Sequence, residues 1–158
     1  MSNKTKSIKL VLTDVTFNFP RLGTPWRPEF EGNKDHAQWS TRVEGLSSAA
    51  LAKLKDAGAP VKTTDSGEPC LNFKAYTVDS YGNPSDFKVY SIENGKLVEM
   101  PKELRDTIGQ GSTGHIRGYM YQNDYDTWSF RMTAVAIDNL VERADANSVE
   151  QLEADFGL

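Results

Sequence analysis

Polar and apolar residues alternate along several stretches of the chain, with the period of a β-strand that has one buried side. The alternation is clearest at 71–78 and 115–122. Similar patterns, with β-branched and aromatic residues, predict further strands at 8–19, 36–43, 86–92, 97–98 and 127–141. The pattern therefore predicts a β-rich domain of about five to seven short strands.

The two clearest strands place basic and aromatic side chains together on their polar sides. The later strand carries Arg117, Tyr119 and Tyr121 there, and the earlier one carries Lys74 and Tyr76. Rows of exposed aromatic rings are unusual on a monomeric protein and indicate a binding partner.

The end of the first strand is expected where prolines begin. Segment 21–27 is predicted to be an exposed, fairly stiff loop that presents Trp26 and Arg27. Within the strand before it, alternation predicts that Phe19 lies on the same side as Phe17.

One clear helix is predicted after the second strand. Ser47 is a good N-cap, 49–57 is rich in strong helix formers, and Gly58 is a typical stop. Segment 101–108 is expected to form one or two helical turns that begin at its proline. The residues at 93–95 favour a tight hairpin turn.

The composition is that of one folded domain in a reducing compartment. The chain has 158 residues, of which 38% are hydrophobic and 25% charged. No apolar run reaches the roughly 20 residues of a membrane helix, and the first residues do not form a signal-peptide core. Cys70 is the single cysteine and cannot form an internal disulfide. We expect a cytoplasmic protein that does not enter a membrane.

The net charge of −4 is concentrated at the C-terminus. Segment 142–158 has five acidic residues and one basic residue, which leaves 17 of each sign in 1–141. A neutral body can carry a basic groove on one face, so the overall acidity does not exclude a nucleic-acid partner.

Catalytic and cofactor motifs have little support in the sequence. Segment 109–114 has the letters of a dinucleotide-binding glycine motif, but helical turns precede it and a strand follows it, which reverses the required order. It is expected to be a flexible connection, or a loop whose backbone lies close to DNA. His36 and His115 are far apart, and Asp124 and Asp126 suit a polar hairpin tip better than a metal site. We expect no enzyme activity, cofactor or metal.

Basic residues repeatedly lie within two positions of an aromatic residue. A groove that binds single-stranded nucleic acid needs cations for phosphates beside flat rings for bases. The alternative for each pair is that the ring belongs to the core and the cation marks the outer side of its strand. The candidate phosphate contacts are Arg21, Arg27, Arg42, Lys74, Lys88 and Arg117, and the candidate stacking rings are Trp26, Trp39, Tyr76, Tyr90, Tyr119 and Tyr121.

The C-terminal segment has two interpretations, which are compatible if its helix forms only on binding. Ser148 could cap a short packed helix with Val149, Leu152 and Phe156 on one side. Alternatively, a mobile acidic segment imitates DNA, occupies the basic groove weakly and binds other proteins when DNA displaces it. The residues expected to contact partners are Glu150, Glu153, Asp155 and Phe156.

Four short motifs, taken in order, resemble those of phage single-stranded DNA-binding proteins. They are LTDVTFNFP at 12–20, LNFK at 71–74, IGQGS at 108–112 leading into a strand, and TAVAIDNL at 133–140. The similarity covers residues 8–141, with the acidic segment after it.

The resemblance implies a mainly β, OB-fold-like five-stranded barrel with additional strands and one short helix over 1–141, and an acidic C-terminal tail over 142–158. It implies non-enzymatic binding and protection of single-stranded DNA, without sequence preference, during phage replication and recombination in the host-cell cytoplasm. The tail would contact phage or host replication proteins such as polymerase or helicase-primase, although the chain ends two residues beyond Phe156 rather than at the aromatic residue. A homodimer is a possible further partner.

The alternative function is a phage structural or protein-interaction β-domain that uses the exposed aromatic face and the acidic tail.

Overall fold

The computed structural model describes residues 7–26, 37–78, 81–122, 127–142 and 149–158. The strands in these ranges are β1 (Ile8–Trp26), β2 (Gln38–Glu44), β3 (Lys62–Thr63), β4 (Pro69–Tyr76), β5 (Lys88–Glu93), β6 (Lys96–Glu99), β7 (Ser112–Gln122) and β8 (Trp128–Asn139). The helices are α1 (Ser48–Ala57), α2 (Lys102–Arg105) and α3 (Val149–Asp155). The described chain is mainly β, as predicted, and β3 is the strand that the alternation did not reveal. None of its helices has the length and apolar character needed to cross a bilayer.

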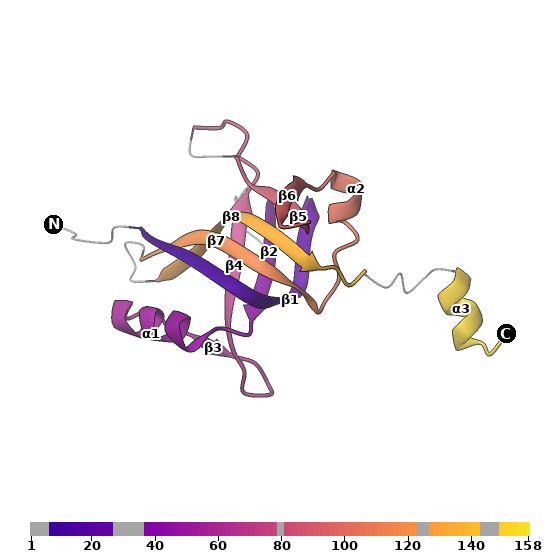
Figure 1. The fold of residues 1–158 in the computed structure, drawn as a ribbon, viewed down its shortest axis with the longest axis horizontal. Coiled ribbons are helices and arrows are strands. Elements are labelled where there is room, and N and C mark those ends of the chain that lie inside the picture. The colour runs from indigo at the N-terminus through magenta and orange to yellow at the C-terminus, as the bar shows by residue number, and fades with distance from the viewer. Residues whose placement is uncertain (1–6, 27–36, 79–80, 123–126, 143–148) are drawn as a thin grey trace, which may run out of the picture.

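Five of the described strands close into a barrel (Figure 1). Strand β1 pairs with β2 on one side and β7 on the other, β2 continues to β4, and β7 continues to β8, all antiparallel. A parallel contact between β4 and β8, in which Lys74 is registered with Arg131, closes the ring. The hairpin of β5 and β6 extends the sheet from β8, and β3 pairs with β4.

The core fills the inside of this barrel and follows the predicted alternation. In β4, Leu71 and Phe73 are buried while Asn72 between them is exposed. In β7, Ile116 and Met120 are buried. Alternating burial fixes which side chains face outward, because a shift of one residue would exchange the two faces.

Strand β1 is longer than the sequence predicted, because the chain continues through the prolines as a strand up to Trp26. Its pairing with β2 is interrupted by register shifts between Asn18 and Arg21 and between Arg21 and Trp26. Irregular pairing of this kind tolerates prolines, which cannot donate to a regular ladder. The expectation of a loop at 21–27 was therefore wrong for 21–26, and Arg27 lies outside the described residues.

The predicted helices are present. Ser47 caps α1 with its hydroxyl, which accepts a hydrogen bond from the backbone N–H of Ala50 at 3.1 Å, and Gly58 ends it at φ 77°. Leu54 packs this helix against the core. Pro101 precedes α2 as its N-cap rather than its first helical residue.

Two glycines of β7 allow this strand to pack closely against β8. A Cβ at Gly114 would meet the carbonyl group of Ala136 on β8, with its carbon 2.9 Å away. A Cβ at Gly118 would lie equally close to the carbonyl carbon of Arg131. The Ser112 hydroxyl is buried and donates to the carbonyl of Gly109 at 2.9 Å. This part of the chain is built for tight contact between β7 and β8.

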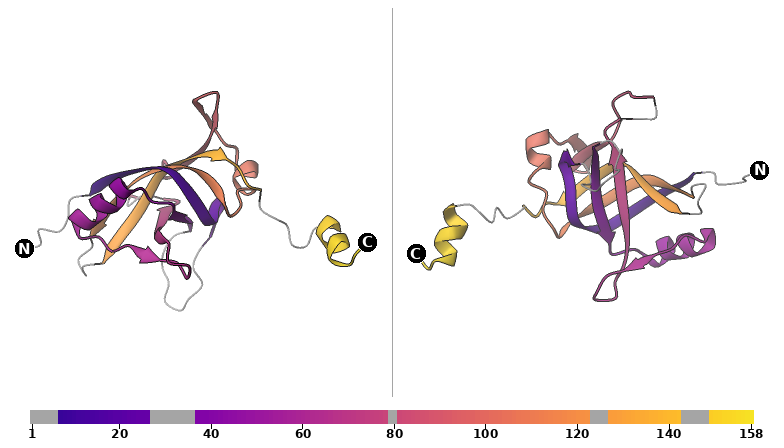
Figure 2. Two further views of the ribbon diagram at one scale, coloured as in Figure 1. Left: turned by 60° about the horizontal axis from the view of Figure 1, so that its bottom comes forward. Right: turned by 180° about the vertical axis from the view of Figure 1, so that it is seen from behind.

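The C-terminal segment contains α3, whose apolar side chains are exposed. Val149 is 69% exposed and Phe156 71% exposed. Figures 1 and 2 show α3 beyond the end of the barrel. The helix itself agrees with the first interpretation of this segment, but its apolar side is not packed as that interpretation expected.

Candidate nucleic-acid interface

The outward side of β4 and β2 forms a polar surface with basic residues. Lys74 and Tyr76 alternate with buried residues of β4, as predicted. The register of the two strands places Ser40 opposite Lys74 and Arg42 opposite Asn72. Residues opposite each other in a sheet share one face, so these side chains lie side by side on the outside of the barrel.

A cleft of about 680 Å³ lies on this surface, between the end of β1, β2, β4 and the start of β8. We call it the first cleft. The side chains that matter for its chemistry are Phe19, Trp26, Arg42, Lys62, Lys74 and Trp128. Its lining contains three cations and, among the described residues, no carboxylate, so its charge favours an anionic ligand.

Phe19 faces outward into the first cleft, which corrects the prediction that it shares the buried side with Phe17. Its backbone adopts φ 50°, a left-handed conformation that is costly for a residue with a bulky side chain. This conformation turns the side chain out of the alternation, and the ring is 63% exposed. The Arg42 guanidinium carbon lies 5.3 Å from the ring centroid.

Trp26 forms another aromatic wall of the first cleft. Its indole Nε1–H donates to the hydroxyl of Ser40 at 2.9 Å. The guanidinium carbon of Arg21 lies 4.7 Å from the ring centroid. The contact places a positive charge beside a flat ring, although Arg21 and Trp26 are five positions apart rather than within two as in the sequence pattern.

A second cleft of about 790 Å³ lies along the outward side of β4, β7 and β8. Its lining includes the basic and aromatic residues Tyr76, Arg117, Tyr119, Tyr121 and Arg131, and one carboxylate, that of Asp86. The rings of Tyr119 and Tyr121 are stacked, with centroids 6.0 Å apart and 28° between their planes.

Arg131, in the lining of the second cleft, contacts two of its tyrosine rings. Its guanidinium carbon lies 4.2 Å from the ring centroid of Tyr76 and 5.8 Å from that of Tyr121. Its Nη2 donates to the Tyr121 hydroxyl at 3.0 Å. Lys74 reaches the ring of Tyr76 as well, with Nζ 5.3 Å from the centroid. Two cations therefore share one ring.

Two arginine nitrogens in these clefts are buried without a hydrogen-bond acceptor in the described part of the chain. They are Nε of Arg42 in the first cleft and Nε of Arg131 in the second. A buried donor without a partner is costly. In this conformation neither nitrogen is exposed, so donation to a ligand would require its guanidinium group to turn.

Trp39, another predicted stacking residue, lies apart from the clefts. Its indole N–H donates to the carbonyl of Gly23 at 2.8 Å. Its ring packs 5.2 Å from that of Phe87 and 5.2 Å from the guanidinium carbon of Arg105. Burial lowers the pKa of Arg105, since desolvation disfavours its charged form.

Lys88 and Tyr90, predicted to contact DNA, lie on β5 and line neither cleft. Lys88 Nζ forms an ion pair with Glu99 at 3.0 Å. The hydrogen bond to Glu99 and its charge raise the pKa of Lys88.

The structure adds residues that the sequence did not single out as candidates. Arg131 alternates with buried Met132 on β8, so the same argument used for β7 could have placed it outward. Lys62 on short β3 gave no signal, because two residues show no period. Phe19 could not be found from the pattern, because its left-handed backbone breaks the alternation.

In the tail, Glu153, Asp155 and Phe156 are exposed. The side chain of Glu150 lies outside the described residues.

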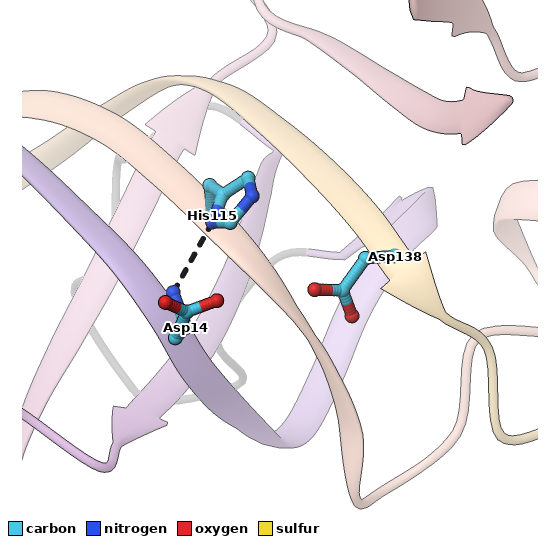
Figure 3. A group of neighbouring side chains, drawn as sticks. All are labelled: Asp14, His115 and Asp138. Atoms are coloured by element: carbon cyan, nitrogen blue, oxygen red, sulfur yellow. Dashed lines mark hydrogen bonds between the residues drawn. The ribbon is translucent and has the colours of Figure 1, made fainter. Parts of the chain in front are cut away.

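Asp14, His115 and Asp138 form a small polar group outside both clefts (Figure 3). Potential ligand atoms of the three lie within 4.8 Å of one another. The backbone N–H of Asp14 donates to His115 Nδ1 at 3.1 Å, and the Thr113 hydroxyl donates to Asp138 at 2.6 Å. The hydrogen bond at His115 Nδ1 ties β1 to β7, so a cation could bind at this nitrogen only by replacing that bond.

The strand order and the parallel closing contact define an OB-fold barrel, the fold that the resemblance implied. The chain is similar over this fold to gp2.5, a single-stranded DNA-binding protein encoded by bacteriophage T7, with 13% identity and a TM-score of 0.52 over 95% of this chain and 94% of that one. It is also similar to the single-stranded DNA-binding protein of bacteriophage Enc34, solved in complex with single-stranded DNA, with 11% identity and a TM-score of 0.53 over 87% and 89% of the two chains.

Comparison of the sequence with protein-family models and with curated proteins finds no match.

Proposed function

We propose that this protein binds single-stranded DNA, without sequence preference, on the outward surface that contains the two clefts. The observation that carries the proposal is the contact of Arg131 and Lys74 with the ring of Tyr76. It places positive charge and an aromatic face together, which is what a ligand with charged phosphates and unstacked bases requires. The two proteins with a similar fold are named as single-stranded DNA-binding proteins, which supports the same ligand class.

Cations and rings have separate roles in this proposal. The phosphates are neutralised by Arg21, Arg42, Lys62, Lys74, Arg117 and Arg131. The bases stack on Phe19, Trp26, Tyr76, Tyr119 and Tyr121. Trp39 is left out because its ring packs against Phe87, and Lys88 and Tyr90 because they line neither cleft. Arg21 also lines neither cleft, but it is included because its guanidinium carbon lies 4.7 Å from the ring of Trp26 in the first cleft. Arg27 keeps its predicted role as an expectation.

Binding rather than catalysis suits this surface. Every base has a flat face, so stacking does not distinguish one base from another. Among the described residues that line the second cleft, Asp86 supplies the one carboxylate. Hydrolysis of phosphate esters by metal ions requires a cluster of such ligands. We therefore propose a non-enzymatic protein that coats and protects DNA during phage replication and recombination in the host cytoplasm.

The proposal assigns different roles to two parts of the chain. Residues 1–141 form the DNA-binding domain, and 142–158 form an acidic tail that competes with DNA and contacts replication proteins. The exposed Phe156 and the acidic residues near it on α3 support a role in protein contacts.

A fluorescence titration with oligo-dT at two salt concentrations tests the function. Trp26 and Trp128 line the first cleft, so bound bases should quench their emission. Binding should weaken steeply as salt rises. Tyr119→Ala should weaken binding by roughly 1–3 kcal/mol without changing the preference among bases. Leu97→Ala, on exposed β6, is the matched control. Absence of salt-dependent binding would refute the proposal and favour a protein-interaction domain.

A further inference from the structure

The two clefts adjoin along the pair of strands that closes the barrel. On β8, Phe130 lines the first cleft and the next residue, Arg131, lines the second. On β4, Lys74 lines the first cleft and Tyr76 the second. Both strands therefore pass from one cleft to the other at the same place.

The boundary between the clefts is positively charged. Lys74 and Arg131 are registered with each other across the closing contact of the barrel. Both cations approach the ring of Tyr76, at 5.3 Å and 4.2 Å from its centroid. An anionic group that binds between the clefts would meet two cations and one aromatic face.

Both clefts offer the same two kinds of contact. Each has exposed aromatic surface, from Phe19 in the first and Tyr119 in the second. Each also has a buried arginine nitrogen without an acceptor in the described chain, on Arg42 and Arg131 respectively. A chain that alternates flat bases with phosphates at regular spacing matches this repeated arrangement.

We infer that a single DNA strand occupies both clefts at once and crosses from one to the other between Lys74 and Arg131. This inference rests on the proposed function and deepens it. It goes beyond binding on the outward surface in general, because it puts both clefts on the path of one strand and places the crossing at the closing contact of β4 with β8. The bases on either side of the crossing stack in different clefts, and a phosphate between them meets both cations.

The inference is tested with one variant in each cleft and a series of oligo-dT from about 4 to about 16 nucleotides, the span of known OB-fold site sizes. Phe19→Asn removes the ring of the first cleft, and asparagine tolerates the left-handed backbone there. Tyr119→Ala removes a ring of the second cleft. Both side chains are exposed, so neither change opens the core. Leu97→Ala is the control, and thermal melts verify that each variant is folded.

With the longest oligonucleotide, the expected stoichiometry is one strand per protein. Each variant should then weaken binding by about 5- to 150-fold, the loss of one stacked base, while Leu97→Ala leaves binding unchanged. If only one of the two variants weakens binding at every length, or if two long strands bind one protein, the shared path is wrong. If the unaltered protein binds no oligonucleotide at any length, the proposed function itself fails, which is a distinct result.

Discussion

Replacement of Lys74 by glutamine tests the electrostatic part of the site most directly. Lys74 lies on the outward side of β4 and lines the first cleft. Among the ion pairs in the described part of the chain, none involves this lysine. Glutamine keeps most of the length of the side chain and removes its charge. The expected change is therefore the loss of one phosphate contact rather than a change of fold.

The expected salt dependence of the affinity follows from the number of cations on the surface. We propose six phosphate contacts, and each contributes about −0.7 to the slope of log affinity against log salt for a single strand. The unaltered protein should then have a slope of about −4, and Lys74→Gln a slope smaller by about 0.7. Between 50 and 200 mM salt, this predicts a loss of affinity of about 300-fold for the unaltered protein and about 130-fold for the variant.

The assay is fluorescence anisotropy of labelled oligo-dT at four or more salt concentrations. Lys96→Gln is the matched control, because Lys96 is an exposed lysine on β6 that lines neither cleft. Its slope should equal that of the unaltered protein. Equal slopes for Lys74→Gln and Lys96→Gln would show that no phosphate contacts Lys74, and would refute the electrostatic argument.

Two further predictions concern the barrel and the tail. Gly118→Ala should lower the free energy of unfolding by about 1–3 kcal/mol in urea titrations, because a Cβ would overlap the carbonyl group of Arg131 on β8. An unchanged unfolding midpoint would show that β7 and β8 can move apart to accommodate the methyl group. Truncation after residue 141 should raise the affinity for DNA, more at low salt than at high salt, because salt screens the competition by the acidic tail. An affinity that does not change on truncation would contradict that competition.

The faces of the strands could be predicted because alternation is a local property. The outward placement of Lys74 and Tyr119 follows from the buried residues on either side of each. The start and end of α1 could be predicted for the same reason, since Ser47 and Gly58 act through their own backbone and side-chain geometry.

The parts that could not be predicted depend on pairing between distant segments. Whether the chain continues as a strand past Pro20 is decided by β2, and the outward turn of Phe19 is decided by the irregular register of that pair. Trp39 looked like a surface residue because its neighbours are polar, but contact with Phe87, distant in the sequence, holds it against the core. Arg131 joins Tyr76 only because β8 returns beside β4.

The closing contact of the barrel has a consequence for its mechanics. Like charges that face each other across a sheet repel, so Lys74 and Arg131 destabilise the pairing of β4 with β8. A phosphate held between them would cancel this repulsion and stabilise the pairing of the two strands. The pairing of β4 with β8 would then be more stable in the DNA-bound barrel than in the free one.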